Sequence, residues 1–164
     1  MPDHPLAFFL TWVCYGTWLH GDERESVDKA TNQFGEPRLP FNPAQKASRH
    51  KQLTHPPYSL GPRERGVTLR TIQQVCEHRK WRLMELNVRT NHVHVVVLSA
   101  ASADKTLADL KAWCTRRLRE AGLLGKQEPA WAEEGSTIWL WTPEQVAEKR
   151  RYVRDEQGPD LPME

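Results

Sequence analysis

The sequence predicts an α+β fold: one four-stranded antiparallel sheet with helices packed on one face, plus a C-terminal helix. Segments rich in β-branched and aromatic residues, which are typical of strands, are interspersed with segments of helical periodicity. Their order along the chain is strand, helix, strand, strand, helix, strand, helix. The length of 164 residues suits one domain spanning the chain, residues 1–164. No apolar run approaches the roughly 18 residues needed to cross a bilayer.

Four strands are expected where β-branched and aromatic residues gather. The first runs from Leu6 to Leu19 and is followed by turn-forming residues. The second and third, Trp81 to Asn87 and His92 to Ser99, are joined by four residues, as in a hairpin. The fourth runs from Ser136 to Trp141.

Three helices are expected between and after these strands. Val67 to Lys80 and Thr106 to Gly122 place apolar residues on one helical face. The last helix runs from Thr142 to Gly158, because Thr142-Pro143-Glu144-Gln145 supplies an N-cap, a first-turn proline and a capping-box glutamine. Between the first strand and the first helix, residues from about 22 to 65 read as a proline-rich loop insertion, with one short helix near Pro43 to Leu53.

Composition excludes several protein classes. A net charge of +2 is too small for a general polycation, so any nucleic-acid site must be a local patch. Three widely spaced cysteines without a CxxC pair indicate reduced thiols rather than disulfides or a zinc ribbon. The mean hydropathy of −0.70 and the acidic start of the chain lead us to expect a soluble cytoplasmic protein.

The segment His92-Val93-His94 is the first candidate for chemistry. In a strand, side chains two residues apart share a face, so both imidazoles point the same way and Val93 points the other way. Two imidazoles side by side are the start of a metal site, although two histidines can also simply occupy a half-exposed strand.

Tyr152 is the best placed of the three tyrosines to act as a nucleophile. Tyr15 falls within the first strand, where a packing role is expected, and Tyr58 lies in the loop insertion. On the last helix, Glu156 is four residues after Tyr152, so the two share a helical face. A carboxylate added to two imidazoles suits Mg²⁺ or Mn²⁺; the alternative is an exposed amphipathic helix with a half-buried tyrosine.

The motif Asn91-His92-Val93-His94 before a run of valines, together with Tyr152-Val153 and a polar residue at 156, resembles the HUH single-tyrosine transposases. Among them it is most similar to the relatives associated with repeated extragenic palindromes (REP). The likeness covers residues 7–18, 67–98 and 135–158, and it implies the ferredoxin-like HUH fold.

The resemblance also implies roles for single residues. His92 and His94 would bind a divalent ion, and Tyr152 would attack the scissile phosphate of single-stranded DNA. The product would be a covalent 5′-phosphotyrosine, reversed by a 3′-hydroxyl. In the family an asparagine or glutamine commonly occupies the position of Glu156, and here a glutamine appears only at Gln157, so the third metal ligand is open between these two.

Basic residues suggest where DNA would bind. The clusters expected to attract phosphates are Lys149, Arg150, Arg151 and Arg154 around Tyr152, and Arg116 and Arg117 on the preceding helix. Either cluster could instead be a solvated helix face. Trp131, Trp139 and Trp141 could stack on unpaired bases or pack in the core.

The sequence therefore favours a metal-dependent enzyme that nicks and rejoins single-stranded or hairpin DNA, as in DNA transposition, and that is associated with the nucleoid. The alternative is a retained DNA-binding protein on the same fold that has lost catalysis. A third hypothesis is a zinc-binding structural domain without a DNA role. The sequence leaves open whether the last helix packs on its own subunit or on the partner in a homodimer.

Overall fold

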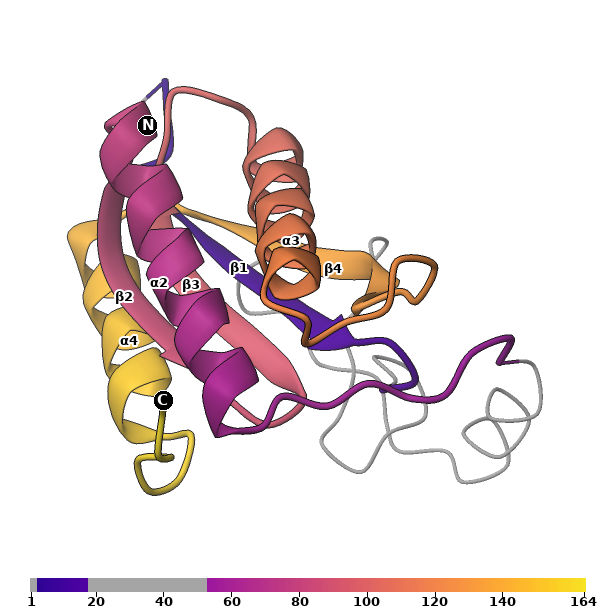
Figure 1. Cartoon of the computed structure of the whole chain (residues 1–164). Helices are drawn as coiled ribbons and strands as arrows, with labels where there is room; N and C mark the ends of the chain where they lie inside the picture. Colours follow the sequence, from indigo (N-terminus) through magenta and orange to yellow (C-terminus); the bar gives the residue numbers. More distant parts are fainter. Residues whose placement is uncertain (1–2, 18–52) are drawn as a thin grey trace.

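The computed structural model describes residues 3–17 and 53–164, which form one four-stranded antiparallel sheet and three helices. The elements follow the chain as β1 (Ala7–Cys14), α2 (Pro62–Arg79), β2 (Arg82–Val88), β3 (His92–Leu98), α3 (Ala103–Glu120), β4 (Trp131–Leu140) and α4 (Pro143–Asp155). Across the sheet the strands are ordered β2-β3-β1-β4 (Figure 1). The predicted fold class is confirmed.

The sheet is covered on both faces, because its two central strands are apolar on both. Leu10 and Trp12 of β1 and Val95 of β3 pack with Ile72 of α2 and Leu110 of α3 in the larger core. Helices α2 and α3 lie side by side over this face (Figure 1). The predicted pair of helices on one face is therefore present.

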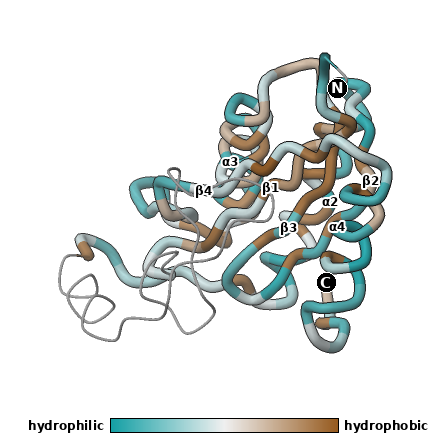
Figure 2. Tube along the Cα trace, turned by 180° about the vertical axis from the view of Figure 1, so that it is seen from behind, coloured by the Kyte–Doolittle hydropathy of each residue, from teal (hydrophilic) through white to brown (hydrophobic). Residues whose placement is uncertain are grey.

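The opposite face carries a smaller core under α4. Phe9, Val96, Ile138 and Leu140 pack there with Val153 of α4, which is fully buried. Figure 2, seen from behind, shows the brown hydrophobic trace of β1 and β3 in the middle of the sheet, with α4 mostly in polar colours. Helix α4 thus presents a narrow apolar face to the sheet.

Several elements begin earlier than the sequence pattern predicts. Helix α2 starts at Pro62, inside the predicted insertion, because proline is accepted in a first turn and the Glu64 side chain accepts a hydrogen bond from the Gly61 amide (2.9 Å). Helix α3 starts at Ala103 because Ser102 caps it through the Lys105 amide (3.1 Å).

Strand β4 begins at Trp131, five residues before the predicted start at Ser136. Its first half is polar and holds Gly135, so its composition does not look like that of a strand. Glycine is needed there because a Cβ would lie 2.8 Å from Cδ2 of Leu107 and 3.0 Å from the Thr11 carbonyl oxygen. Close packing of α3, rather than strand propensity, explains the residue.

The remaining predictions divide into confirmed and untested ones. The capping box of α4 is present, with Thr142 Oγ1 accepting from the Gln145 amide at 3.1 Å. The three cysteines are free and buried, as expected, and burial raises the pKa of Cys76 to about 11.

The predicted short helix near Pro43 to Leu53 and most of the predicted insertion lie outside the described residues. None of the helices in the described part of the chain is long and apolar enough to cross a membrane.

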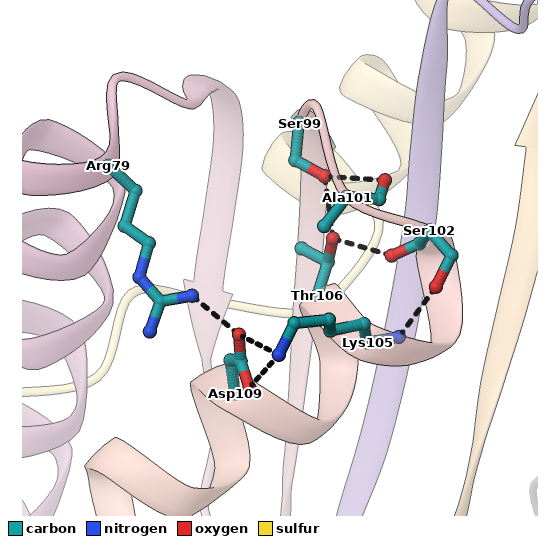
Figure 3. A network of polar contacts seen from close by, with 7 residues as sticks. All are labelled: Arg79, Ser99, Ala101, Ser102, Lys105, Thr106 and Asp109. Carbon is teal, nitrogen blue, oxygen red and sulfur yellow. Dashed lines mark hydrogen bonds and ion pairs between the residues drawn. The ribbon is translucent and has the colours of Figure 1, made fainter.

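A polar network joins α2 to α3 (Figure 3). Arg79 of α2 and Lys105 of α3 both bind the carboxylate of Asp109, which is 19% exposed. Burial alone would raise the pKa of Asp109, but the hydrogen bonds from Arg79 and Lys105 outweigh it and leave the pKa lowered. Beside it, Thr106 Oγ1 donates to the Ser102 carbonyl (2.7 Å) and contacts Ser99 Oγ (2.6 Å).

Candidate active site

His92 and His94 lie on one face of β3, as the alternation of a strand predicts. Their ring centroids are 4.8 Å apart. His94 is buried, with 5% of its surface exposed, and His92 is partly buried. Val93, between them, belongs to the larger core on the other face of the sheet. The histidine pair therefore faces the side of the sheet that α4 covers.

Each histidine is held through Nδ1 by a neighbouring polar side chain. Asn91 Oδ1 accepts from His92 Nδ1 at 2.9 Å. Thr11 Oγ1 lies 2.8 Å from His94 Nδ1, because Thr11 of β1 is paired with His94 across the sheet. Contacts of this kind orient a ring and assign its other nitrogen, Nε2, to a ligand.

Tyr152 of α4 lies against the histidine pair of the same chain. Its ring meets the His94 ring edge-on, with the centroids 5.6 Å apart, and also contacts Phe9 at 6.0 Å. Phe9 is in turn stacked on His94 at 5.4 Å. The helix is fixed to the sheet by the buried Val153, whose carbonyl oxygen accepts from the Asn87 side chain at 2.8 Å.

The end of α4 decides which polar side chain reaches the histidines. The helix ends at Asp155, three residues before the predicted end, and Glu156 at its C-cap has an exposed side chain. The chain then folds back, so that Gln157 Oε1 lies 3.2 Å from His92 Nε2 while Gln157 Nε2 donates to the Tyr152 carbonyl at 3.3 Å. Of the two candidate third ligands, Gln157 is the one beside the histidine pair.

No three His, Cys, Asp or Glu side chains within residues 3–17 and 53–164 gather closely enough to hold a metal ion. A third protein ligand next to His92 and His94 would therefore be an amide oxygen such as that of Gln157. The exposed carboxylate of Glu156 does not form such a group with the pair.

The four cations of α4 differ in their surroundings. Lys149 Nζ lies over two rings, 5.2 Å from the centre of the Phe9 ring and 5.4 Å from that of the Tyr152 ring.

The arginines of α4 are bound to acidic side chains or exposed. Arg150 and Arg154 are paired with Glu85 of β2, at 3.4 and 3.9 Å. Arg151 is exposed. Arg154 also binds Asp155, and its guanidinium holds the pKa of that carboxyl below its usual range. Lys149 is thus the cation placed over the Tyr152 ring.

Arg116 and Arg117 do not join this group. They lie on α3, which packs on the other face of the sheet, and both bind Glu120, at 3.2 and 3.0 Å. Both guanidinium groups also lie over the Trp113 ring, at 5.1 and 5.6 Å. The two basic clusters predicted from the sequence are therefore on opposite sides of the molecule.

The other two tyrosines are separate from the histidine pair. Tyr15 follows β1 in a turn, not in the strand as predicted; hydrogen bonding from Thr54 lowers its pKa. The Tyr58 hydroxyl donates to the Leu123 carbonyl at 2.9 Å, and burial raises its pKa far above the usual value.

The three tryptophans proposed to stack on bases differ in exposure. Trp131 packs in the core. Trp139 is 52% exposed, and its ring centroid lies 5.8 Å from that of Trp141.

The site includes residues that sequence reasoning missed. Phe9 and Thr11 face the histidines from β1, two residues apart as a strand requires. Alternation along β1 could have placed them on one face, but only the register of Thr11 against His94 shows that they belong to this site.

The chain matches no known family and no curated protein in sequence. Among solved structures it is similar to a candidate transposase from Deinococcus radiodurans R1, with a TM-score of 0.47 and 12% identity over 96% of this chain and 95% of that one. It is also similar to a REP-associated tyrosine transposase bound to a REP hairpin, with a TM-score of 0.48 and 8% identity over 93% and 68%. With both TM-scores below 0.5, these likenesses assign no function to the chain.

Proposed function

We propose that the protein nicks and rejoins single-stranded DNA through a covalent bond to Tyr152, with a divalent ion held by His92 and His94. The observation that carries the proposal is the contact of the Tyr152 ring with His94, 5.6 Å between centroids, within one chain. A phenol, two imidazoles and an amide from separate elements converge on one face of the sheet, and ordinary core packing does not require that combination of groups.

The side chains present fit a divalent ion. His92 Nε2 and Gln157 Oε1 face one another at 3.2 Å, and the His94 ring is 4.8 Å from the His92 ring. Two imidazole nitrogens and one amide oxygen form a mixed set that leaves positions open for phosphate oxygens, which suits Mn²⁺ or Mg²⁺. The bound ion would polarise the scissile phosphate. Glu156 remains the second candidate for the third ligand.

The reaction we propose is the one that the resemblance to the HUH single-tyrosine transposases implies, with Tyr152 as the attacking group. The phenol loses its proton to solvent and its oxygen attacks phosphorus, while the bond from phosphorus to the 3′ oxygen breaks and that oxygen takes up a proton. The DNA 5′ end is then held as a phosphotyrosine. In rejoining, a 3′-hydroxyl attacks the phosphorus, gives up its proton, and the Tyr152 oxygen leaves.

Lys149 supports this proposal from the side of binding. Its ammonium lies over the Tyr152 ring, where a positive charge attracts the phosphate that the tyrosine is to attack. Arg150, Arg151 and Arg154 add positive charge along the same helix, although two of them share it with Glu85. The DNA partner we propose is single-stranded or hairpin DNA.

The test is trapping of a covalent adduct between the protein and a labelled hairpin-bearing single strand in Mn²⁺. Wild type should form the adduct; Tyr152→Phe should bind the strand nearly as well and form none, because only the attacking atom is lost. Tyr15→Phe and Tyr58→Phe are the matched controls and should retain it. A wild-type mobility shift without any adduct would favour the alternative, a DNA-binding protein without catalysis. Adduct from Tyr152→Phe would move the nucleophile elsewhere.

A further inference from the structure

The segment after α4, residues 157–164, crosses from the site to the start of α2. It turns back below α4, and its end lies beside the first turn of α2 (Figure 1). The Glu164 amide donates to the Pro62 carbonyl at 3.0 Å, and Arg70 donates to the Glu164 carbonyl at 3.3 Å. We name residues 157–164 the tail segment. It is hydrogen-bonded at one end to His92 and at the other to α2.

Two buried arginines hold the tail segment. Arg65 of α2, 5% exposed, donates to the Pro162 carbonyl through Nε at 3.2 Å and Nη2 at 2.6 Å, and to the Leu60 carbonyl at 2.7 Å. Arg89, 9% exposed, donates to the Pro159 carbonyl at 3.0 Å. A guanidinium stays charged in a protein interior, so it needs these acceptors. Undocking the tail segment would therefore remove three of the hydrogen bonds that these two guanidinium groups make.

Arg89 also links the tail segment to the histidines through the main chain. It lies in the turn between β2 and β3, and its amide donates to the His92 carbonyl at 2.8 Å. Gln157, at the start of the tail segment, contacts His92 Nε2 and the Tyr152 carbonyl. The same eight residues thus contact the turn before His92, the His92 ring and the last turn of α4.

We propose that Arg65 and Arg89 are positioning residues: through the tail segment they hold Gln157 and Tyr152 against the histidine pair of their own chain. The significance for DNA cleavage rests on the proposed function, whereas the docking of α4 does not.

Gly66 offers a test that leaves both arginines intact. It lies in α2 where an added Cβ would overlap the main-chain oxygen of Glu164, so Gly66→Ala must displace the end of the tail segment. Alanine is the better helix former, so the substitution should not weaken α2 itself. Arg65→Gln removes the guanidinium instead. Arg63→Gln, an exposed arginine in the same first turn, is the matched control.

The measurement is hydrogen exchange in the full-length protein, without metal or DNA, together with adduct formation. In Gly66→Ala and Arg65→Gln, amides of α4 should exchange about tenfold faster or more, with β1 and β3 unchanged and Arg63→Gln like wild type. The rate of adduct formation should fall by about tenfold with DNA affinity retained, which a stability loss alone would not produce. Unchanged α4 exchange in both variants, or equal acceleration throughout the sheet, would overturn the proposal. If wild type forms no adduct, the proposed function fails and the exchange data still decide the positioning role.

Discussion

At the scale of single residues, the contact between Thr11 and His94 gives a direct test of how the histidines are oriented. Thr11→Val keeps the shape of the side chain and removes the oxygen that lies 2.8 Å from His94 Nδ1. We expect Mn²⁺ affinity to fall by about 10- to 100-fold, the usual effect of losing an orienting contact, with unfolding little changed. Calorimetric titration with Mn²⁺ measures the affinity, and urea unfolding measures the stability. Thr115→Val, on α3, is the control, and equal losses in both variants would contradict the role of Thr11.

The third ligand is tested by comparing two neighbouring residues. Gln157→Ala should raise the Mn²⁺ concentration needed for adduct formation more than Glu156→Ala does, because only Gln157 lies beside His92. Each variant is titrated with Mn²⁺ in the adduct assay. A larger effect of Glu156→Ala would mean that the chain after α4 rearranges when the ion binds.

The histidines themselves should be dispensable for folding but not for nicking. His92→Ala removes one ligand from a partly exposed position, so we expect loss of adduct with little change in stability. His94→Ala should cost more, on the order of 1–2 kcal/mol, because a buried ring stacked on Phe9 is lost. Urea unfolding and adduct trapping measure both quantities. Normal nicking by either variant at low metal concentration would contradict the metal assignment.

Sequence patterns could predict which residues of β3 and α4 carry chemistry, but not every contact. The period of a strand places His92 and His94 together, and the capping box at Thr142 indicates the helix that presents Tyr152. The pattern did not reveal that α4 ends at Asp155, because the residues that follow have no helix-breaking signal before Gly158. Counting four residues on from Tyr152 therefore selects Glu156, whereas the folded chain brings Gln157 to His92.

At the scale of elements, the link between α2 and α3 should depend on pH. The pKa of Asp109 is lowered in the fold, so its contribution is fully present above its ordinary value near 3.8 and is lost as the pH falls through the lowered value. Asp109→Asn should therefore cost about 1 kcal/mol at pH 7 and much less at an acid pH below the lowered pKa of Asp109. Urea unfolding at both pH values measures the difference. Asp160→Asn, at an exposed aspartate, is the control. A loss of stability in Asp109→Asn that did not shrink in acid would contradict the role of the ion pairs.

Element centres were predictable and element boundaries were not. Apolar periodicity places the middle of α2, α3 and β3 correctly, since burial of one face drives it. Strand β4 was shortened in the prediction because its first residues, including Gly135, are selected by contact with Leu107 and Thr11 from other elements. Such tertiary contacts leave no local periodic signal.

At the scale of the whole molecule, the two cores should respond differently to truncation. Leu110→Ala, in the larger core between α2, α3 and the sheet, should cost about 2–5 kcal/mol of global stability. Val153→Ala, on the buried face of α4, should cost roughly 1–2 kcal/mol and loosen that helix first. Denaturant unfolding followed by tryptophan fluorescence measures the global cost, and hydrogen exchange of α4 the local one. A Val153→Ala cost as large as that of Leu110→Ala would mean that the sheet depends equally on both cores.

The alternation of β3 makes the histidine pair a reporter of correct strand pairing. If β3 paired with β1 one residue out of register, His92 and His94 would point into the larger core and Val93 would take their place beside α4. Burying two imidazoles among valines without partners would be costly. A misfolded sheet would thus lose both its stability and its site in the same error. In a refolded sample, the fraction of molecules that form the proposed adduct with DNA would count the correctly registered sheets.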